Sequence, residues 1–134
     1  MNKALIADLI TAFHFGYVII VVLGLLIILL GGALQWCFVK NFWFRVIHLL
    51  MILIVVLEAL GGITCPLTDW EYDLRVEAGQ KNVSDVSFIA RLIHKLIFYD
   101  FPPIVFTVTY CLFGIVVLMS WRLVPPVLPW KSRR

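Results

Sequence analysis

Charge is what this sequence has least of. Lys, Arg, Asp and Glu together make up 14% of its 134 residues, whereas hydrophobic residues make up 63%. Soluble globular domains carry about 25% charged residues, so the composition excludes an ordinary soluble domain. Several runs approach the ~20 apolar residues that a helix needs to cross a bilayer. We therefore predict an integral membrane protein with a single domain.

Cysteine is also scarce, and the sequence lacks the usual patterns of catalytic sites. Cys37, Cys65 and Cys111 fall at unmatched predicted depths without a C-x-x-C pair, which excludes a disulfide framework. There is no Gly-rich phosphate loop, Ser-His-Asp set or cluster with metal-ligand spacing, so no catalytic residue and no metal site is predicted. The few basic residues lie along predicted membrane edges, where anionic lipid explains them better than nucleic acid does.

The hydrophobic runs predict an all-α fold. Transmembrane helices are expected at about 10–34, 44–63 and 102–121, with an outer loop at 64–101 and a tail at 122–134. The connection at 35–44 is rich in aromatic residues, as membrane-water interfaces are. Apolar residues between 88 and 97 recur at helical spacing, with polar residues on the other side. This pattern predicts an amphipathic helix in the interface plane.

The chain turns sharply at residues 61–75. Pro66 has no amide hydrogen and disfavours helix at Cys65, so the second span is expected to end there. Thr68 and Glu71 have the spacing of a capping box, which predicts a short loop helix beginning at Thr68. Glu71 and Arg75 lie four residues apart on that helix and are expected to pair.

The distribution of charge predicts an orientation. The side with the short turn and the tail has no acidic residue and six basic ones, namely Lys40, Arg45, Arg122, Lys131, Arg133 and Arg134. The loop side has seven acidic residues, Asp85 among them, and five basic ones. The positive-inside rule then places the tail in the cytoplasm. The N-terminus and the Cys65 loop would lie outside, which in a Gram-negative cell is the periplasm.

Ionisable residues inside a span are costly and need a reason. His14 lies about one turn inside the outer end of the first span, and Glu58 about one turn before the outer end of the second. Antiparallel helices would bring them to similar depth, so we predict a His14–Glu58 hydrogen bond that offsets part of their desolvation cost. Two interpretations stay open: a structural link between helices, or a site for a proton or ligand.

Arg45 and His48 form a second polar pair, at the cytoplasmic end. Arg45 is expected to extend to the lipid headgroups. A single haem cannot use both His48 and His14, because they lie at opposite ends of the membrane. Haem b would need His14 with His94, or His48 with a ligand from another subunit; a solvated helix face explains His94 more simply. No cofactor is firmly predicted, and haem b or a quinone remain alternatives.

The residues of the turn carry a resemblance. The run from Gly61 to Thr68, followed by Glu71 and by Leu74 with Arg75, resembles a family of small bacterial inner-membrane proteins recognised by a CPLT-x-x-E-x-x-LR signature. The resemblance covers nearly the whole chain. It implies the membrane class but no activity, since that family is one of unknown function. It marks these positions for testing: His14, Arg45, His48, Glu58, Cys65, Glu71 and Arg75.

The sequence favours a non-enzymatic accessory or structural component of a membrane complex. Its predicted outer polar cluster comprises His14, Glu58, Cys65, Thr68, Glu71 and Arg75. The alternative is a redox or ligand-binding membrane protein in which His14 and Glu58 handle a proton, a quinone or haem. Three helices bury little surface against one another, so we expect a homo-oligomer or other membrane-protein subunits as partners.

Overall fold

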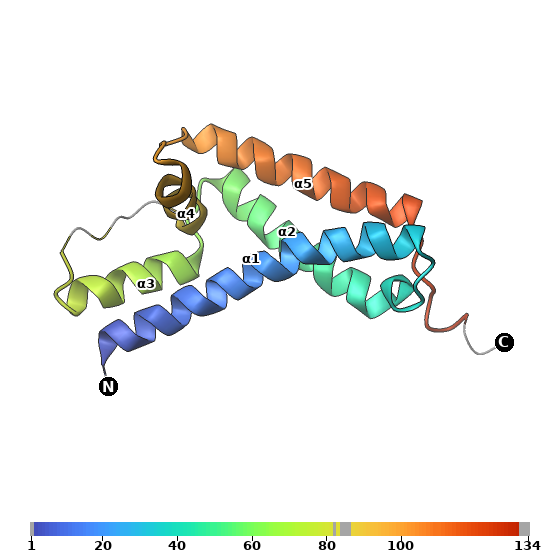
Figure 1. The fold of residues 1–134 in the computed structure, drawn as a ribbon, viewed down its shortest axis with the longest axis horizontal. Helices are drawn as coiled ribbons and strands as arrows, with labels where there is room; N and C mark the ends of the chain where they lie inside the picture. Colours follow the sequence, from blue (N-terminus) through green and yellow to red (C-terminus); the bar gives the residue numbers. More distant parts are fainter. Residues whose placement is uncertain (1, 82, 84–86, 132–134) are drawn as a thin grey trace.

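The computed structural model describes residues 2–81, 83 and 87–131. Three of the charged residues used above to predict the orientation, Asp85, Arg133 and Arg134, lie outside the described residues. Within it the chain folds into five α-helices and one 3-10 turn (Figure 1). Three of the helices, α1, α2 and α5, are long and apolar enough to cross a membrane. The elements are α1 (Lys3–Ala33), η1 (Phe38–Lys40), α2 (Phe42–Gly61), α3 (Pro66–Glu77), α4 (Phe88–Ile97) and α5 (Pro103–Leu123).

The first helix is longer than the sequence predicted, because it begins at Lys3 instead of near residue 10. Its 31 residues span ~46 Å at the usual helical rise, against ~30 Å for the hydrocarbon core of a bilayer. Helices α2 and α5 have 20 and 21 residues, which fits a bilayer. Gly31 and Gly32 of α1 lie against Val39 and Val124. The three helices therefore end together at this end of the molecule, which we call the tail end.

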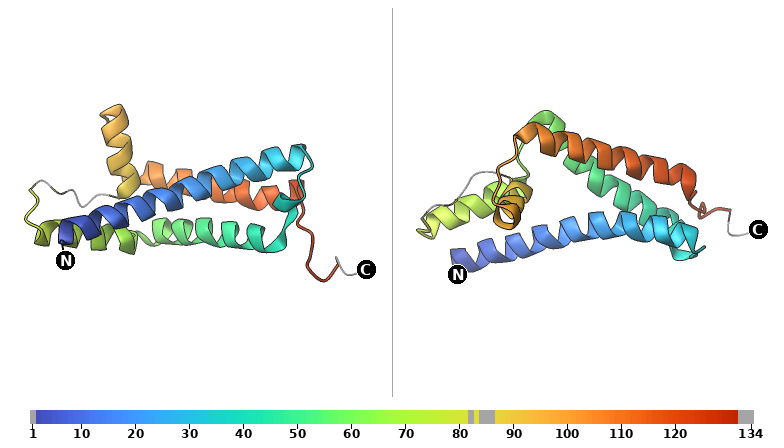
Figure 2. Two further views of the ribbon diagram at one scale, coloured as in Figure 1. Left: turned by 60° about the horizontal axis from the view of Figure 1, so that its bottom comes forward. Right: turned by 45° about the horizontal axis from the view of Figure 1, so that its top comes forward.

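The excess length of α1 lies at the opposite end, called here the loop end, and packs against α3. Lys3 pairs with Glu77 and Asp8 pairs with Arg75, so the two helices run antiparallel. They lie side by side in every view (Figures 1 and 2). We call this unit the α1–α3 pair. Helix α4 stands crosswise to the long helices beside it (Figure 2), as an interfacial helix would.

A small apolar core joins the three long helices. It consists of Val21, Leu25, Ile52 and Val117, all of them buried. The Tyr17 hydroxyl donates to the backbone carbonyl of Met51 at 2.7 Å and ties α1 to α2. Of the most apolar window of each long helix, at most 28% is buried inside the molecule. The outward apolar side chains thus leave most of the surface of these helices suited to lipid.

Helix ends differ from the prediction where a local cap decides them. Helix α2 begins two residues early, because the Asn41 side chain accepts hydrogen bonds from the amides of Trp43 and Phe44. It ends at Gly61, and Gly62 follows in the left-handed conformation with φ of 64°. Asp100 shortly precedes α5 but does not cap it. It contacts His94 Nδ1 at 2.7 Å instead, and the cap position is Pro102.

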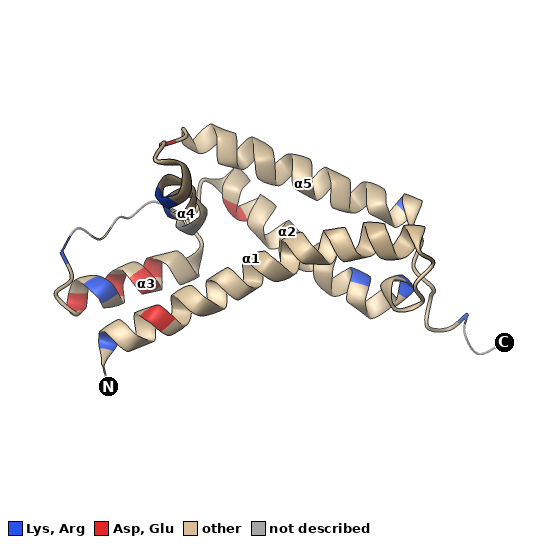
Figure 3. Ribbon diagram, viewed as in Figure 1, with Lys and Arg blue, Asp and Glu red and all other residues tan. Residues whose placement is uncertain are grey.

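The tail of the chain returns to the turn between α1 and α2. The amide of Val127 donates to the carbonyl of Lys40 at 2.7 Å. The Phe42 ring contacts the rings of both Trp121 and Trp130. Helix α5 continues to Leu123, and the described residues beyond it, 124–131, contain no helix. The described acidic residues all lie in the loop-end half, whereas lysine and arginine occur at both ends (Figure 3).

Glycine packing in α1 gives a first prediction. A Cβ at Gly24 would lie 2.5 Å from Cδ2 of His48, whereas a Cβ at Gly16 would meet nothing within 4 Å. Gly24→Ala should therefore lower the free energy of unfolding by about 1–3 kcal/mol through overpacking. Gly16→Ala should raise it by up to about 1 kcal/mol through helix propensity. Thermal unfolding in detergent measures both, and equal midpoints for the two variants would contradict this helix contact.

Candidate functional site

The loop helix α3 begins differently from the predicted capping box. Its first residue is Pro66 and its N-cap is Cys65, so the helix starts two residues before Thr68. Proline is favoured at the first helical position because its fixed φ suits the helix and its missing amide is not needed there. Thr68 therefore lies inside the helix. It is buried, and its hydroxyl has no hydrogen-bond partner in the described part of the chain.

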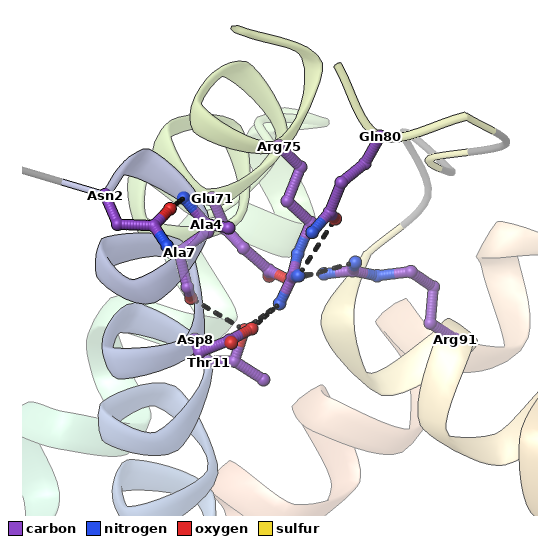
Figure 4. A network of polar contacts seen from close by, with 9 residues as sticks. All are labelled: Asn2, Ala4, Ala7, Asp8, Thr11, Glu71, Arg75, Gln80 and Arg91. Carbon is purple, nitrogen blue, oxygen red and sulfur yellow. Dashed lines mark hydrogen bonds and ion pairs between the residues drawn. The ribbon is translucent and has the colours of Figure 1, made fainter. Parts of the chain in front are cut away.

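Glu71 is the centre of the polar site. Only 2% of its side chain is exposed. The carboxylate accepts a hydrogen bond from Arg75 Nε at 2.9 Å, as predicted from their spacing. It also accepts two from Arg91 of α4, at 2.6 Å to Oε2 and 3.2 Å to Oε1 (Figure 4). One buried carboxylate thus binds two guanidinium groups from two helices, one of them in the two-point geometry that favours arginine.

Arg75 carries the contact on to α1. Its Nη2 atom lies 3.0 Å from Oδ1 of Asp8 and donates to the Thr11 hydroxyl at 3.0 Å. The Thr11 hydroxyl in turn donates to the carbonyl of Ala7. Three helices therefore meet through Glu71. We call Glu71, Arg75, Arg91, Asp8 and Thr11 the Glu71 cluster (Figure 4).

The ionisation of Glu71 follows from these contacts. Burial alone would raise the pKa of its carboxyl. The hydrogen bonds from Arg91 and Arg75 outweigh burial, and the pKa lies below the ordinary value of 4.5. Glu71 is therefore ionised at neutral pH. A carboxylate held in this state stabilises structure and is a poor proton acceptor.

His14 and Glu58 have different partners from those predicted. His14 is buried, and the carboxylate that acts on its ring is Glu71, with Arg91 the nearby cation. The Glu58 side chain instead lies beside the thiol of Cys65. The reason is that α2 packs along α5 and runs away from α1 towards the loop end, whereas the first turns of α1 pack against α3 (Figures 1 and 2). Of the predicted cluster, His14 thus lies near Glu71, which pairs with Arg75, whereas Glu58 lies with Cys65.

The Cys65 thiol is half-buried at the start of α3. Burial is the main cause that raises its pKa above the ordinary value, and the neighbouring Glu58 carboxylate adds to it. A raised pKa lowers the fraction of reactive thiolate. Cys65 is one of three free cysteines, of which Cys37 is the exposed one.

The second polar pair lies at the tail end, away from the Glu71 cluster. Arg45 points into the helices with 1% of its surface exposed, so the expectation that it extends to the headgroups is wrong. Its Nη2 donates to the Ser120 hydroxyl at 3.1 Å, and its guanidinium lies 5.6 Å from the Trp121 ring. A hydroxyl and an aromatic face from α5 thus hold the cation inside. His48 Nε2 lies 2.8 Å from the carbonyl oxygen of Val21.

The histidines do not converge on one place. His14 lies near Glu71 of α3, and the His48 ring contacts Val21 and Gly24 further along α1. His94 is half exposed beside Asp100. Within residues 2–81, 83 and 87–131 there is no group of three or more His, Cys, Asp or Glu side chains that could hold a metal ion. The one signal for Arg91 in the sequence was its place on the polar side of an amphipathic helix. That pattern does not reveal a partner twenty residues away.

An open groove of about 500 Å³ adjoins the Glu71 cluster, lined by α1, α3 and α4. It brings together the two arginines of the cluster, Lys95, and the apolar side chains of Phe15 and Leu92. The groove lies where the α1–α3 pair meets the crosswise helix α4. The arrangement can hold three helices in place and can offer positive charge beside an apolar wall.

Comparison with known proteins gives a family without an activity. The family described as "Protein of Unknown function (DUF2784)" matches residues 4–126, which include all of the Glu71 cluster and the groove. No curated protein and no solved structure matches the chain. The functional argument therefore depends on the geometry of the site.

The Glu71 cluster gives a second prediction. Glu71→Gln removes the negative charge that two guanidinium groups share, so the free energy of unfolding should fall by about 3 kcal/mol. The matched control is Glu77→Gln, which breaks an ion pair with Lys3 whose side chains are 52% and 56% exposed. Its cost should be below about 1 kcal/mol. Thermal and denaturant unfolding in the same detergent compare the two variants.

Acidification checks the same contact. Because the folded-state pKa of Glu71 is lowered, its stabilisation is complete above the ordinary glutamate range and is lost as pH falls through that lowered pKa. The wild-type protein should lose stability over this acidic window, and Glu71→Gln should lack that part of the loss. Equal stability of the Glu71→Gln and Glu77→Gln variants would argue against the cluster.

Proposed function

The chain belongs to the family described as Protein of Unknown function (DUF2784), and from this premise we propose that it is a non-enzymatic accessory or structural component of a bacterial inner-membrane complex. In this proposal α1, α2 and α5 cross the membrane, while the α1–α3 pair and α4 stand at its outer face. The tail is cytoplasmic. The role of the protein is to present the α1–α3 pair to other membrane-protein subunits.

The observation that carries this proposal is the Glu71 carboxylate. It is buried, ionised and shared by Arg75 and Arg91. Catalytic acids and bases need a pKa near the working pH, and the lowered pKa of Glu71 is opposite to that need. Burying a charge that is fully paired within the chain fixes α3 and α4 to α1. The geometry therefore supports a structural role for the most buried acidic group.

The α1–α3 pair also has the surface that a partner would need. Leu5, Leu9 and Phe13 recur at every fourth residue of α1 and are 56%, 63% and 65% exposed. This spacing puts them along one side of the helix. Because this part of α1 exceeds the length needed to cross the bilayer, its apolar side is available to another protein subunit, either a second copy or a different chain.

Purification from native membranes tests this function. The wild-type chain in mild detergent should elute as an oligomer or with a companion in fixed proportion. Leu9→Asn should reduce that association at least fivefold, because a polar side chain would be buried without a partner. The control is Val76→Asn on α3, a similarly exposed apolar position of the same pair. A monomer without a companion, or a companion retained by Leu9→Asn, would contradict the proposed role.

Cysteine labelling tests the orientation. A membrane-impermeant thiol reagent should label an introduced Lys81→Cys in intact spheroplasts, because residue 81 is exposed and lies in the proposed outer loop. Native Cys37 is exposed as well but should react only after permeabilisation, since it lies in the proposed cytoplasmic turn. Mass spectrometry of the labelled peptides separates the two sites. Labelling of Cys37 in intact spheroplasts would reverse the proposed topology.

A further inference from the structure

We propose that the groove between α1, α3 and α4 binds an anionic phospholipid, holding its phosphate with Lys95 and Arg91 and its acyl chains along Phe15 and Leu92. The inference rests on the membrane location proposed above and not on the proposed protein partner. It concerns a ligand, whereas the proposed function concerns the docking of another subunit by a different surface of α1.

The charge of the groove favours an anion. Its lining contains three basic residues, Arg75, Arg91 and Lys95, and two acidic ones, Asp8 and Glu71. The net charge of the lining is therefore +1. The two carboxylates are already matched by the two guanidinium groups of the Glu71 cluster. The positive charge that remains is that of Lys95.

Two hydrogen-bond donors in the groove are left for a phosphate. Lys95 is exposed and makes no hydrogen bond or ion pair with the described residues. Nε of Arg91 is buried and has no hydrogen-bond partner among the residues that the structure describes, although both terminal nitrogens of the same guanidinium bind Glu71. A buried donor without a partner is costly, and a phosphate oxygen is a strong acceptor for it.

The apolar part of the groove favours a lipid over a soluble anion. Ala12 and Phe15 of α1 and Leu92 of α4 complete the lining beside the charged residues. On the last turn of α4, Leu96 and Ile97 are 71% and 61% exposed, as expected for a helix lying at a lipid surface. Acyl chains can therefore continue from the groove along α4 towards the hydrocarbon. A soluble phosphate would leave this apolar wall in contact with water.

The size and position of the groove agree with a headgroup site. Its volume of about 500 Å³ lies within the usual range of ~300–1,000 Å³ for ligand sites. Helix α4 crosses the long helices at the level of Glu71, as the contact with Arg91 requires. Basic pockets between membrane helices are known to hold anionic headgroups. Here the pocket is closed on one side by an internal ion-pair cluster, which fixes the direction of Arg91.

Native mass spectrometry of the purified full-length chain tests the site. Phosphatidylglycerol and phosphatidylcholine of equal chain length are titrated separately into the protein in detergent, and the fraction with lipid bound gives an apparent Kd for each. Wild type should prefer phosphatidylglycerol. Lys95→Gln should weaken phosphatidylglycerol binding about fivefold, which corresponds to about 1 kcal/mol for one basic residue near a headgroup. It should weaken phosphatidylcholine binding by less, because the choline cation already offsets the charge of that lipid's phosphate.

Matched variants make the result specific. Lys81→Gln removes the same charge from an exposed position outside the groove and should bind like wild type. Lys95→Arg keeps the charge and should bind like wild type as well. Lys95 has no hydrogen bond or ion pair to lose among the described residues, so thermal unfolding of Lys95→Gln should match wild type. If that variant nevertheless fails to fold, Leu92→Asn on the apolar wall replaces it and should weaken both lipids.

Several outcomes would overturn the proposal. These are equal affinity for the two lipids in the wild-type protein, unchanged phosphatidylglycerol binding in Lys95→Gln, or the same loss in Lys81→Gln. Competition by soluble glycerol 3-phosphate at concentrations comparable to those of the lipid would assign the site to a free phosphate ester instead. Because binding is measured on the isolated chain, these outcomes are distinguishable from failure to find a protein partner.

Discussion

The carboxylate of Glu71 is the constraint on which the loop end depends. Removing a carboxylate from water costs several kcal/mol unless cations and hydrogen bonds replace the solvent. The cations that take the place of water around Glu71 come from two helices: Arg75 from α3 and Arg91 from α4. Arg75 also contacts Asp8 and Thr11 of α1. The position of each of these helices is thereby tied to the same two oxygen atoms. The groove beside the cluster exists because α4 is held at that place.

The length of α1 determines what the cluster can contact. Because α1 continues to Lys3, its first turns lie beside α3 and supply Asp8 and Thr11 to Arg75. His14 follows on the same helix, near Glu71. Glu58 is left with Cys65 at the junction of α2 and α3. The two acidic residues thus separate into different local environments.

At the tail end, the buried charge of Arg45 is stabilised in a different way. Arg45 is as deeply buried as Glu71 but contacts a hydroxyl and an aromatic ring, with no carboxylate partner in the described part of the chain. Close approach of the helices there depends on Gly24 and Gly31, whose missing side chains make room for His48 and Val39. The two ends are therefore held by different chemistry: ion pairs at the loop end, and close packing with one cation at the tail end.

The sequence by itself determined the helical class, the three long apolar helices, the amphipathic helix α4, the turn at Pro66 and the Glu71–Arg75 pair. Each of these depends on neighbours within about two helical turns, so composition, periodicity and spacing reveal them. Only the tertiary structure decided the inward direction of Arg45, the partners of His14 and Glu58, and the contact of Arg91 with Glu71. Those choices depend on how far one helix extends past another and on where a crosswise helix returns. Both are set by packing between segments distant in the chain, which no local pattern records.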